Sequence, residues 1–264
     1  MNSKVPKISI ITITFNSEKT LEETILSIIT QEYDNLEYLI IDGASKDGTM
    51  KIVDKYRDKI SFVLSEPDKG ISDAFNKGIA HATGEIIGII NSDDILLPGA
   101  LATVAEHYAS DIDVYSGNVM MWDDKTDTSY IRKPDLVFDN ICKAYRAAHP
   151  ARFIRHDAYE RFGGYCIDLR YMMDVDLLYR FYNHGAKSIH IDDVFVKFRI
   201  GGVSSDNHSK KKNDRLVFVR NNGGSKFDFY YICWKACIRN CIKKSLAKLS
   251  SKNIQNKLHS ILNR

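Results

Sequence analysis

The sequence predicts an α/β fold, in which a mostly parallel central sheet has helices on its faces, followed by a basic helical C-terminal tail. Short apolar runs that suit buried strands alternate with amphipathic segments through the first half of the chain. Polar residues directly follow several of these runs, as at the carboxyl ends of parallel strands, where α/β proteins bind ligands. From residue 209 onward, 14 Lys and Arg accompany only two Asp, so a basic tail follows an acidic body.

The first half is expected to hold four buried strands and four helices. The predicted strands are residues 8–13, 36–41, 60–64 and 86–90, and the predicted helices follow Ser17 and cover residues 49–56, 72–82 and 98–108. Ser17 and Ser72 are predicted to cap their helices, because a serine oxygen can accept from a first-turn N–H group. Pro98 is expected at a first helical position, where its missing N–H costs nothing.

The second half has a more mixed pattern. Residues 114–119 and 130–133 are predicted strands, and residues 174–183 are a predicted helix that ends at Gly185. These elements are expected to complete a site begun by the first half. The chain is therefore divided into a catalytic domain, residues 1–208, and a basic, aromatic-rich helical segment, residues 209–264.

Composition narrows the class of protein. The chain is 44% hydrophobic and 27% charged, as in ordinary globular proteins, and it has no run of 18 uncharged apolar residues that could span a membrane. Its N-terminus lacks a signal-peptide core, and its five cysteines fit a reducing compartment, so a cytoplasmic location is expected. Cys233, Cys237 and Cys241 share a helix face, more as small hydrophobes than as metal ligands.

Three segments contain polar residues that could bind a nucleotide, bind a metal ion or act as a general base. Asp42 ends the second strand and could accept hydrogen bonds from a base or ribose, although Asp-Gly is also a common turn dipeptide. Asp93 follows the fourth strand and offers the hard oxygen that Mg²⁺ or Mn²⁺ prefers, with helix capping as the alternative for Asp93 or Asp94. Asp174 lies among apolar residues, which suits a general base, while Asp176 could simply pair with Arg180 one turn later.

In this order and spacing, the motifs resemble those of the family 2 glycosyltransferases, which have the GT-A (Rossmann-like) fold and include bacterial surface-polysaccharide enzymes. The matching segments are residues 11–16 (ITITFN), 42–49 (DGASKDGT), 66–78 (EPDKGISDAFNKG), 84–85 (GE), 91–94 (NSDD), 161–165 (RFGGY) and 174–177 (DVDL). The resemblance covers roughly residues 5–205. It implies an inverting glycosyltransferase that uses a nucleotide-sugar donor, expected to be a UDP-sugar, and Mn²⁺ or Mg²⁺.

The resemblance also implies a role for each matching residue. The donor would be contacted by Thr14, Phe15, Asn16, Asp42, Asp73, Asn76, Ser92 and Asp93. Asp93 would bind the metal, Asp174 would be the general base, and His149 and Asp176 would lie near the acceptor or the diphosphate. Residues 201–204 would be the mobile segment over the donor. Because Asn91 stands at the first position of the family's D-x-D element, metal binding would depend on Asp93 and the donor phosphates.

The tail has aromatic and aliphatic residues at helical spacing beside cations. This pattern fits a segment lying on the anionic inner face of the cell membrane, which would make the enzyme peripheral and its acceptor a lipid-linked saccharide. A helix packed on the catalytic domain, or on a second subunit of a homo-oligomer, is the alternative. No recognisable nucleic-acid-binding motif accompanies the charge, so no nucleic-acid partner is expected.

Other classes of protein fit less well. Nucleotidyltransferases and dehydrogenases need a glycine-rich phosphate loop after the first strand, but residues 12–17 (TITFNS) contain no glycine. A non-catalytic nucleotide-sugar or glycan-binding module remains the alternative from outside the enzymes. Such a module would have no use for a metal carboxylate together with a distant base.

Overall fold

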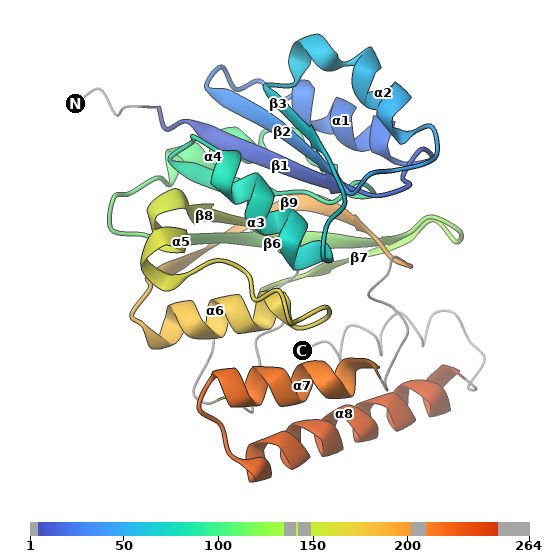
Figure 1. Ribbon diagram of the computed structural model, residues 1–264, viewed down its shortest axis with the longest axis vertical. Coiled ribbons are helices and arrows are strands. Elements are labelled where there is room, and N and C mark those ends of the chain that lie inside the picture. Colours follow the sequence, from blue (N-terminus) through green and yellow to red (C-terminus); the bar gives the residue numbers. More distant parts are fainter. Residues whose placement is uncertain (1–4, 135–140, 142–148, 202–209, 248–264) are drawn as a thin grey trace.

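The computed structural model describes residues 5–134, 141, 149–201 and 210–247. A single central sheet has the strand order β3-β2-β1-β4-β8-β6-β9-β5, and β7 pairs with β6 (Figure 1). The strands are β1 Ile8–Thr14, β2 Leu36–Asp42, β3 Phe62–Ser65, β4 Ile86–Ile89, β5 Ile95–Leu96, β6 Val114–Asp123, β7 Thr128–Arg132, β8 Arg152–Arg155 and β9 Ser188–Arg199. The helices are α1 Leu21–Ile29, α2 Thr49–Lys55, α3 Ile71–His81, α4 Ala100–Glu106, α5 His156–Phe162, α6 Met173–Asn183, α7 Lys210–Asn221 and α8 Lys226–Ala247, with short 3-10 turns at Arg57–Lys59 and His149–Ala151.

The sheet has a parallel half and a mixed half. Strands β3, β2, β1 and β4 are parallel, as the alternation of apolar runs and helices predicted. In the other half β8 runs antiparallel to both β4 and β6, while β6 and β9 are parallel to each other. Thr14 lies beside Asp42 in the register of β1 and β2, so the carboxyl ends of these strands meet at one edge.

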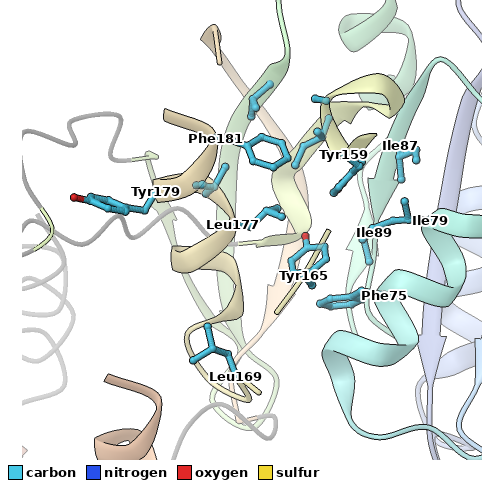
Figure 2. Packing of buried hydrophobic residues seen from close by; sticks show 14 of the residues in the cluster. Phe75, Ile79, Ile87, Ile89, Tyr159, Tyr165, Leu169, Leu177, Tyr179 and Phe181 are labelled. Atoms are coloured by element: carbon cyan, nitrogen blue, oxygen red, sulfur yellow. The ribbon is translucent and has the colours of Figure 1, made fainter. Parts of the chain in front are cut away.

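Side chains of the parallel strands alternate between two hydrophobic layers. Ile10 and Ile40 face the layer that α1, α2 and α4 cover, whereas Ile11 and Leu39 face the layer that contains α3, α5 and α6. Figure 2 shows the second layer, where residues from α3, α5 and α6 converge on β4. Helix α3 can lie close to β1 because residue 78 is glycine: a Cβ at this position would come within 2.4 Å of the Ile11 Cγ2 atom.

The helices begin at residues other than the predicted caps. Helix α1 starts after Thr20, and the Ser17 hydroxyl lies 2.8 Å from the Ser92 hydroxyl. The Ser72 hydroxyl donates to the Leu169 carbonyl (2.9 Å), although Ser72 is the second residue of α3. Pro98 precedes α4 by two positions and so is not at the predicted first helical position, and Gly99, not Asp93 or Asp94, is at the N-cap position of that helix. Both serine predictions were wrong because each hydroxyl has a partner from a distant part of the chain.

The C-terminal helices form an outer layer on α6. In Figure 1, α7 lies between α6 and α8. The Phe218 ring of α7 packs edge-on against Tyr179 of α6, with ring centroids 5.7 Å apart, and Ile232 of α8 joins the same hydrophobic layer. Residues on the two sides of the predicted division at 208/209 therefore share one core. Among the described residues, no helix combines the length and hydropathy that a membrane-spanning segment needs.

Candidate active site

Asp42 and Asn16 shape the turn that follows β2. Asp42 is 0% exposed, and its carboxylate accepts hydrogen bonds from Ser45 N (3.0 Å), Ser45 Oγ and Ser65 Oγ (2.6 Å). Asn16, which has a left-handed φ of 50°, donates its N–H to Ser45 Oγ (2.8 Å) and accepts from Lys46 N at its own Oδ1 (2.8 Å). Asn16 and Asp42, both predicted to contact the nucleotide, are thus joined through Ser45 at the carboxyl edge.

Phe15 gives this edge an exposed aromatic surface. Its side chain is 62% exposed, whereas Thr14 before it is buried and has an Oγ1 without a hydrogen-bond partner among the described residues. A Cβ on Gly43 would come within 2.7 Å of Asp68 Oδ2 and 3.3 Å of the Phe15 ring. A larger residue at position 43 would therefore displace the Asp68 side chain where these loops approach each other. An exposed ring beside close-packed backbone can stack on a nucleobase.

The first turns of α3 contain Asp73 and Asn76, which have different roles. Asp73 accepts a hydrogen bond from Lys69 N (2.9 Å) and lies 3.5 Å from the Lys77 ammonium, and both contacts lower its pKa. The Asn76 amide donates to Tyr165 O and accepts from Tyr165 N, each at 2.8 Å. Asn76 therefore ties the loop before α6 to α3, and its side chain is engaged with backbone instead of facing a pocket.

The turn at residues 91–94 brings two carboxylates together after β4. Asp94 is 0% exposed and accepts from Asn91 Nδ2 (2.9 Å) and Arg199 N (3.1 Å). Burial raises the pKa of the half-buried Asp93, and burial together with the charge of Asp93 raises the pKa of Asp94. Asp94 thus stabilises the turn, which leaves Asp93 as the carboxylate available to a ligand.

Arg199 is a residue of this site that the sequence did not reveal. From the end of β9 its guanidinium donates to Asp93 O (3.2 Å), Asp124 Oδ2 (2.7 Å) and Glu23 Oε2 (2.7 Å), and it lies over the Trp122 ring. The one sequence signal was an arginine near the end of an alternating segment, two residues before a Gly-Gly pair. Arg199 anchors the turn that presents Asp93.

The chemistry around Asp93 fits a divalent cation that is shared with a bound diphosphate. In the described ranges of the chain, no three His, Cys, Asp or Glu residues lie together as a metal site. A cation here would have Asp93 as its protein carboxylate and would take other oxygens from phosphates and water, as Mg²⁺ and Mn²⁺ do. Burial raises the pKa of both Asp93 and Asp94, so the ionised carboxylates are costly here, and a bound cation would stabilise them.

Asp174 lies in the first turn of α6, in the other half of the site. Its Oδ1 atom is buried and has no hydrogen-bond partner in the part of the chain that the structure describes. Burial raises the pKa of Tyr159 and of Tyr165, and the negative charge of Asp174 raises both further. The buried Arg152 of β8 acts on the same two tyrosines with the opposite sign. Asp174 is therefore a carboxylate with a free buried oxygen, next to aromatic rings.

Asp176 does not fit the role predicted for it. It is 1% exposed, and its carboxylate accepts from Arg180 Nε (2.9 Å) and Asn222 Nδ2 (2.8 Å). Arg180 in turn donates to the carbonyls of Phe162 and Gly164. Contact with an acceptor or diphosphate is thus a wrong prediction for Asp176, because its carboxylate is buried in a structural ion pair of the kind that the i, i+4 spacing offered as the alternative.

Two predicted parts of the site lie partly outside the described residues. His149 lies in the 3-10 turn His149–Ala151, directly before β8, so its backbone is at the junction of the two halves of the sheet. Its side chain is outside the described part, and so are residues 202–209, which include most of the predicted mobile segment. Gly201 has a φ of 120°, a conformation that favours glycine.

Comparison with known proteins gives one family. A family model described as Glycosyl transferase family 2 matches residues 9–168. The chain is 30% identical over 252 residues to the putative glycosyltransferase EpsE of Bacillus subtilis, covering 90% of this chain and 84% of the relative. It is also 36% identical over 106 residues to the GalNAc(5)-diNAcBac-PP-undecaprenol beta-1,3-glucosyltransferase of Campylobacter jejuni, covering 39% of this chain and 34% of that relative.

Solved structures with the same fold have low sequence identity. Staphylococcus aureus TarS 1-349 in complex with UDP-GlcNAc has a TM-score of 0.63 at 21% identity, covering 86% of this chain and 70% of that one. The mannosyltransferase PcManGT from Pyrobaculum calidifontis, in complex with GDP-Man and Mn²⁺, also has a TM-score of 0.63, at 19% identity, covering 97% of this chain and 79% of that one. These likenesses confirm the GT-A fold that the motifs predicted.

Proposed function

Because this chain belongs to glycosyl transferase family 2, it is a glycosyltransferase, and we propose that it inverts the transferred sugar in one metal-assisted displacement. The observation that carries the proposal is that the site has two carboxylates with separate environments. Asp93 follows β4 at the carboxyl edge beside Asp94, whereas Asp174 begins α6 and has a buried oxygen without a partner among the described residues. A single displacement needs one group at the leaving diphosphate and another at the attacking hydroxyl.

The donor is proposed to bind at the carboxyl edge of β1 and β2. Phe15 offers its exposed ring to the nucleobase, while Thr14 and Asn16 flank it. Asp42, which was predicted to contact the base or ribose, is 0% exposed and instead holds the neighbouring turn. Asp73, Asn76 and Ser92 border the same site from α3 and from the turn after β4. We propose a UDP-sugar as the donor, which is supported by the shared fold with TarS, whose structure contains UDP-GlcNAc.

Asp93 is the proposed protein ligand of Mn²⁺ or Mg²⁺, with Arg199 fixing the turn that holds it. When bound, the cation would neutralise negative charge that develops on the departing diphosphate. Arg199 donates to the Asp93 carbonyl and not to its carboxylate, so the carboxylate oxygens are not used by that contact.

Asp174 is the proposed general base. Its Oδ1 atom takes the proton of the acceptor hydroxyl, and the hydroxyl oxygen forms a bond to the anomeric carbon of the donor. The bond from that carbon to the diphosphate oxygen breaks, and its electron pair leaves with the nucleoside diphosphate. Attack from the face opposite the leaving group inverts the anomeric configuration. The burial of Oδ1 and its lack of a partner among the described residues support this role, because no hydrogen bond must break before the proton is taken.

The acceptor is proposed to be a lipid-linked saccharide at the inner face of the cell membrane. One face of α8 exposes large apolar side chains, which are Phe227, Tyr230, Trp234, Ile238 and Ile242. The exposed Lys226 and Lys235 accompany them, and the tail as a whole is strongly basic. An apolar face with nearby cations suits an anionic lipid surface. The name of the Campylobacter jejuni relative also describes an undecaprenol-linked substrate.

The proposal is tested by donor hydrolysis. Wild type, Asp93→Ala and, as a matched control, the surface variant Asp58→Asn are incubated with UDP-, GDP- and dTDP-sugars in Mn²⁺, Mg²⁺ or EDTA. Slow release of one nucleoside diphosphate is expected, dependent on metal, unchanged in Asp58→Asn and at least about 100-fold lower in Asp93→Ala. Release that is insensitive to both EDTA and Asp93→Ala would exclude the metal role. Calorimetric donor binding without turnover, for every acceptor offered, would instead indicate a non-catalytic nucleotide-sugar or glycan-binding module.

A further inference from the structure

We propose that Asp214 of α7 is a positioning residue for Asp174, so that the C-terminal helices take part in catalysis through the general base. The inference rests on the proposed function, in which Asp174 is that base. It assigns a role to a buried carboxylate outside the family match at residues 9–168.

The Asp214 carboxylate binds the backbone at the start of α6. Asp214 is 4% exposed, and its Oδ2 atom accepts from three successive backbone N–H groups, those of Arg170 (2.9 Å), Tyr171 and Met172 (3.1 Å). Helix α6 begins at the next residue, Met173. Asp214 therefore caps the N-terminal end of α6 from the turn before it: it binds the N–H of the N-cap residue Met172 and of the two residues before that, although it lies 42 residues further along the chain than Met172.

No nearby side chain performs this task. The residue at the N-cap position, Met172, has no side-chain oxygen and makes no capping hydrogen bond. The first N–H groups of a helix have no partner within the helix, and a carboxylate beside them also interacts favourably with the helix dipole. Without Asp214, the three N–H groups of this turn would lose their common acceptor, and the turn would be free to change conformation.

The position of Asp174 depends on that turn. Asp174 is two residues after Met172, and the Met172 carbonyl accepts from Asp176 N (2.9 Å), closing the first turn around Asp174. Its Oδ1 has no hydrogen bond with the described residues that could orient the carboxylate by itself. The backbone of the first turn is therefore the main constraint on where the base lies. A displacement of about 1 Å in a reacting group can cost on the order of 100-fold in rate.

Other contacts hold α7 in a fixed place against α6. The Phe218 ring packs on Tyr179, and Asn222 donates to Asp176 Oδ1 (2.8 Å). On the opposite side, the Ser72 hydroxyl of α3 donates to Leu169 O (2.9 Å). The loop before α6 thus lies between α3, on the donor side of the site, and α7, on the tail side. Asn222 joins the same two helices through the Asp176 side chain, and its hydrogen bonds with the described residues do not include the backbone of residues 170–172 that Asp214 binds, which makes it a matched control.

The experiment measures kcat and KM for hydrolysis of the UDP-sugar donor, with UDP affinity by calorimetry, in Asp214→Asn, Asp214→Glu, Asn222→Ala and Asp174→Asn. For Asp214→Asn we expect kcat to fall about 10- to 100-fold while the donor KM and UDP affinity stay within about twofold. Asp214→Glu keeps the charge but moves it, so its kcat should lie between those of Asp214→Asn and wild type. Asn222→Ala should stay within about threefold of wild type.

Each other outcome has a definite meaning. Wild-type kcat in Asp214→Asn, or an equal loss in Asn222→Ala at the same melting temperature, would overturn the positioning role. If Asp214→Asn does not fold, Asp214→Glu decides: a several-fold lower kcat at unchanged KM supports the role, and wild-type kcat overturns it. Wild-type turnover in Asp174→Asn would refute the proposed base, and with it the positioning role, whatever the Asp214 variants do.

Discussion

Asp42 and Asp174, on the two sides of the site, are held in different ways. Asp42 accepts hydrogen bonds from Ser45, three residues further along the chain, and from Ser65 on the adjacent strand. Asp174 has a buried oxygen without a partner among the described residues, and Asp214 caps its helix from far along the chain. The donor side is thus largely assembled from neighbouring loops, whereas the base side depends on the packing of α7. A change in the C-terminal helices should therefore affect turnover before it affects donor binding.

The largest effect is expected from Asp174→Asn, which tests whether the two sides fail separately. The amide cannot take the acceptor proton, so turnover should fall about 100- to 10,000-fold while donor KM stays near wild type. Steady-state release of nucleoside diphosphate measures both. Asp93→Ala is the counterpart on the donor side, and there the response to Mn²⁺ should be lost as well. If Asp174→Asn weakened donor binding as strongly as turnover, the separation of the two sides would be wrong.

Arg199→Ala tests a contact on the donor side that does not come from a neighbouring loop, since Arg199 reaches the turn at residues 91–94 from the end of β9. Loss of its hydrogen bond to Asp93 O should loosen the turn that presents the carboxylate. Turnover is expected to fall about 10- to 100-fold, with a higher Mn²⁺ concentration needed for half-maximal rate. A Mn²⁺ titration of activity makes the measurement.

Lys197→Ala is the matched control for Arg199→Ala. Lys197 is on the same strand and its ammonium lies 3.6 Å from the centroid of the same Trp122 ring, but no hydrogen bond to the turn at residues 91–94 is found for it in the described structure. Its substitution should leave the Mn²⁺ response unchanged. An equal shift in both variants would attribute the effect to the Trp122 contact and not to the anchoring of Asp93.

The same comparison explains which parts of the site could be predicted from the sequence. Strands β1, β2 and β4 are apolar runs directly followed by polar loops, so the edge with Asp42 and Asp93 was predictable from period and motif. Asp174 was predictable from its motif as a residue of α6. Arg199 and Asp214 were missed because their partners are 106 and 42 residues away, and no local pattern encodes such contacts.

Wrong predictions have the same physical cause. Ser17 and Ser72 have the side chains of helix caps, but their hydroxyls are used by Ser92 and by the Leu169 carbonyl. Strand β9 was not predicted, because its burial does not alternate regularly and includes exposed acidic residues in the middle. Asp176 was predicted to lie near the acceptor or the diphosphate, but its carboxylate is buried against Arg180 and Asn222. In each case a tertiary contact decided the outcome.

Glu37→Gln tests the opposite end of the sheet, where a charge network should serve stability alone. At the start of β2, the Glu37 carboxylate accepts hydrogen bonds from Lys7 Nζ (2.8 Å), Ser9 Oγ (2.5 Å) and Thr83 N (2.7 Å). Replacement by an amide should lower the free energy of unfolding at pH 7 by about 1–3 kcal/mol, with kcat unchanged. Chemical denaturation measures the first quantity. The exposed Glu32→Gln is the control, and a matching loss there would exclude the network as the cause.

The stability effect of Glu37 should depend on pH. Burial alone would raise its pKa, but the hydrogen bonds from Lys7, Ser9 and Thr83 lower it from 4.5 to about 2. Because the folded-state pKa is the lower one, the ionised group stabilises the fold fully above the unfolded value and loses this effect as the pH falls toward 2. The difference between wild type and Glu37→Gln should therefore be constant near neutrality and shrink in acid. A difference that grew below pH 4 would contradict this.

Substitutions on the outer face of α8 are expected to have the smallest effect on turnover, because they should weaken membrane binding without changing the active site. Phe227 and Trp234 are exposed there, whereas Phe229 and Ile232 pack inward. Phe227→Ser/Trp234→Ser should bind vesicles of phosphatidylcholine and phosphatidylglycerol at least about tenfold more weakly than wild type, because two large apolar side chains no longer enter the lipid interface. Donor hydrolysis in solution should be unchanged, since both side chains are largely exposed on the outer face of α8. Ile131→Ser, at an exposed position of β7, is the control. Vesicle binding that persists in the double variant, or that is absent from wild type, would refute the membrane role of α8 while leaving the capping of α6 by Asp214 intact.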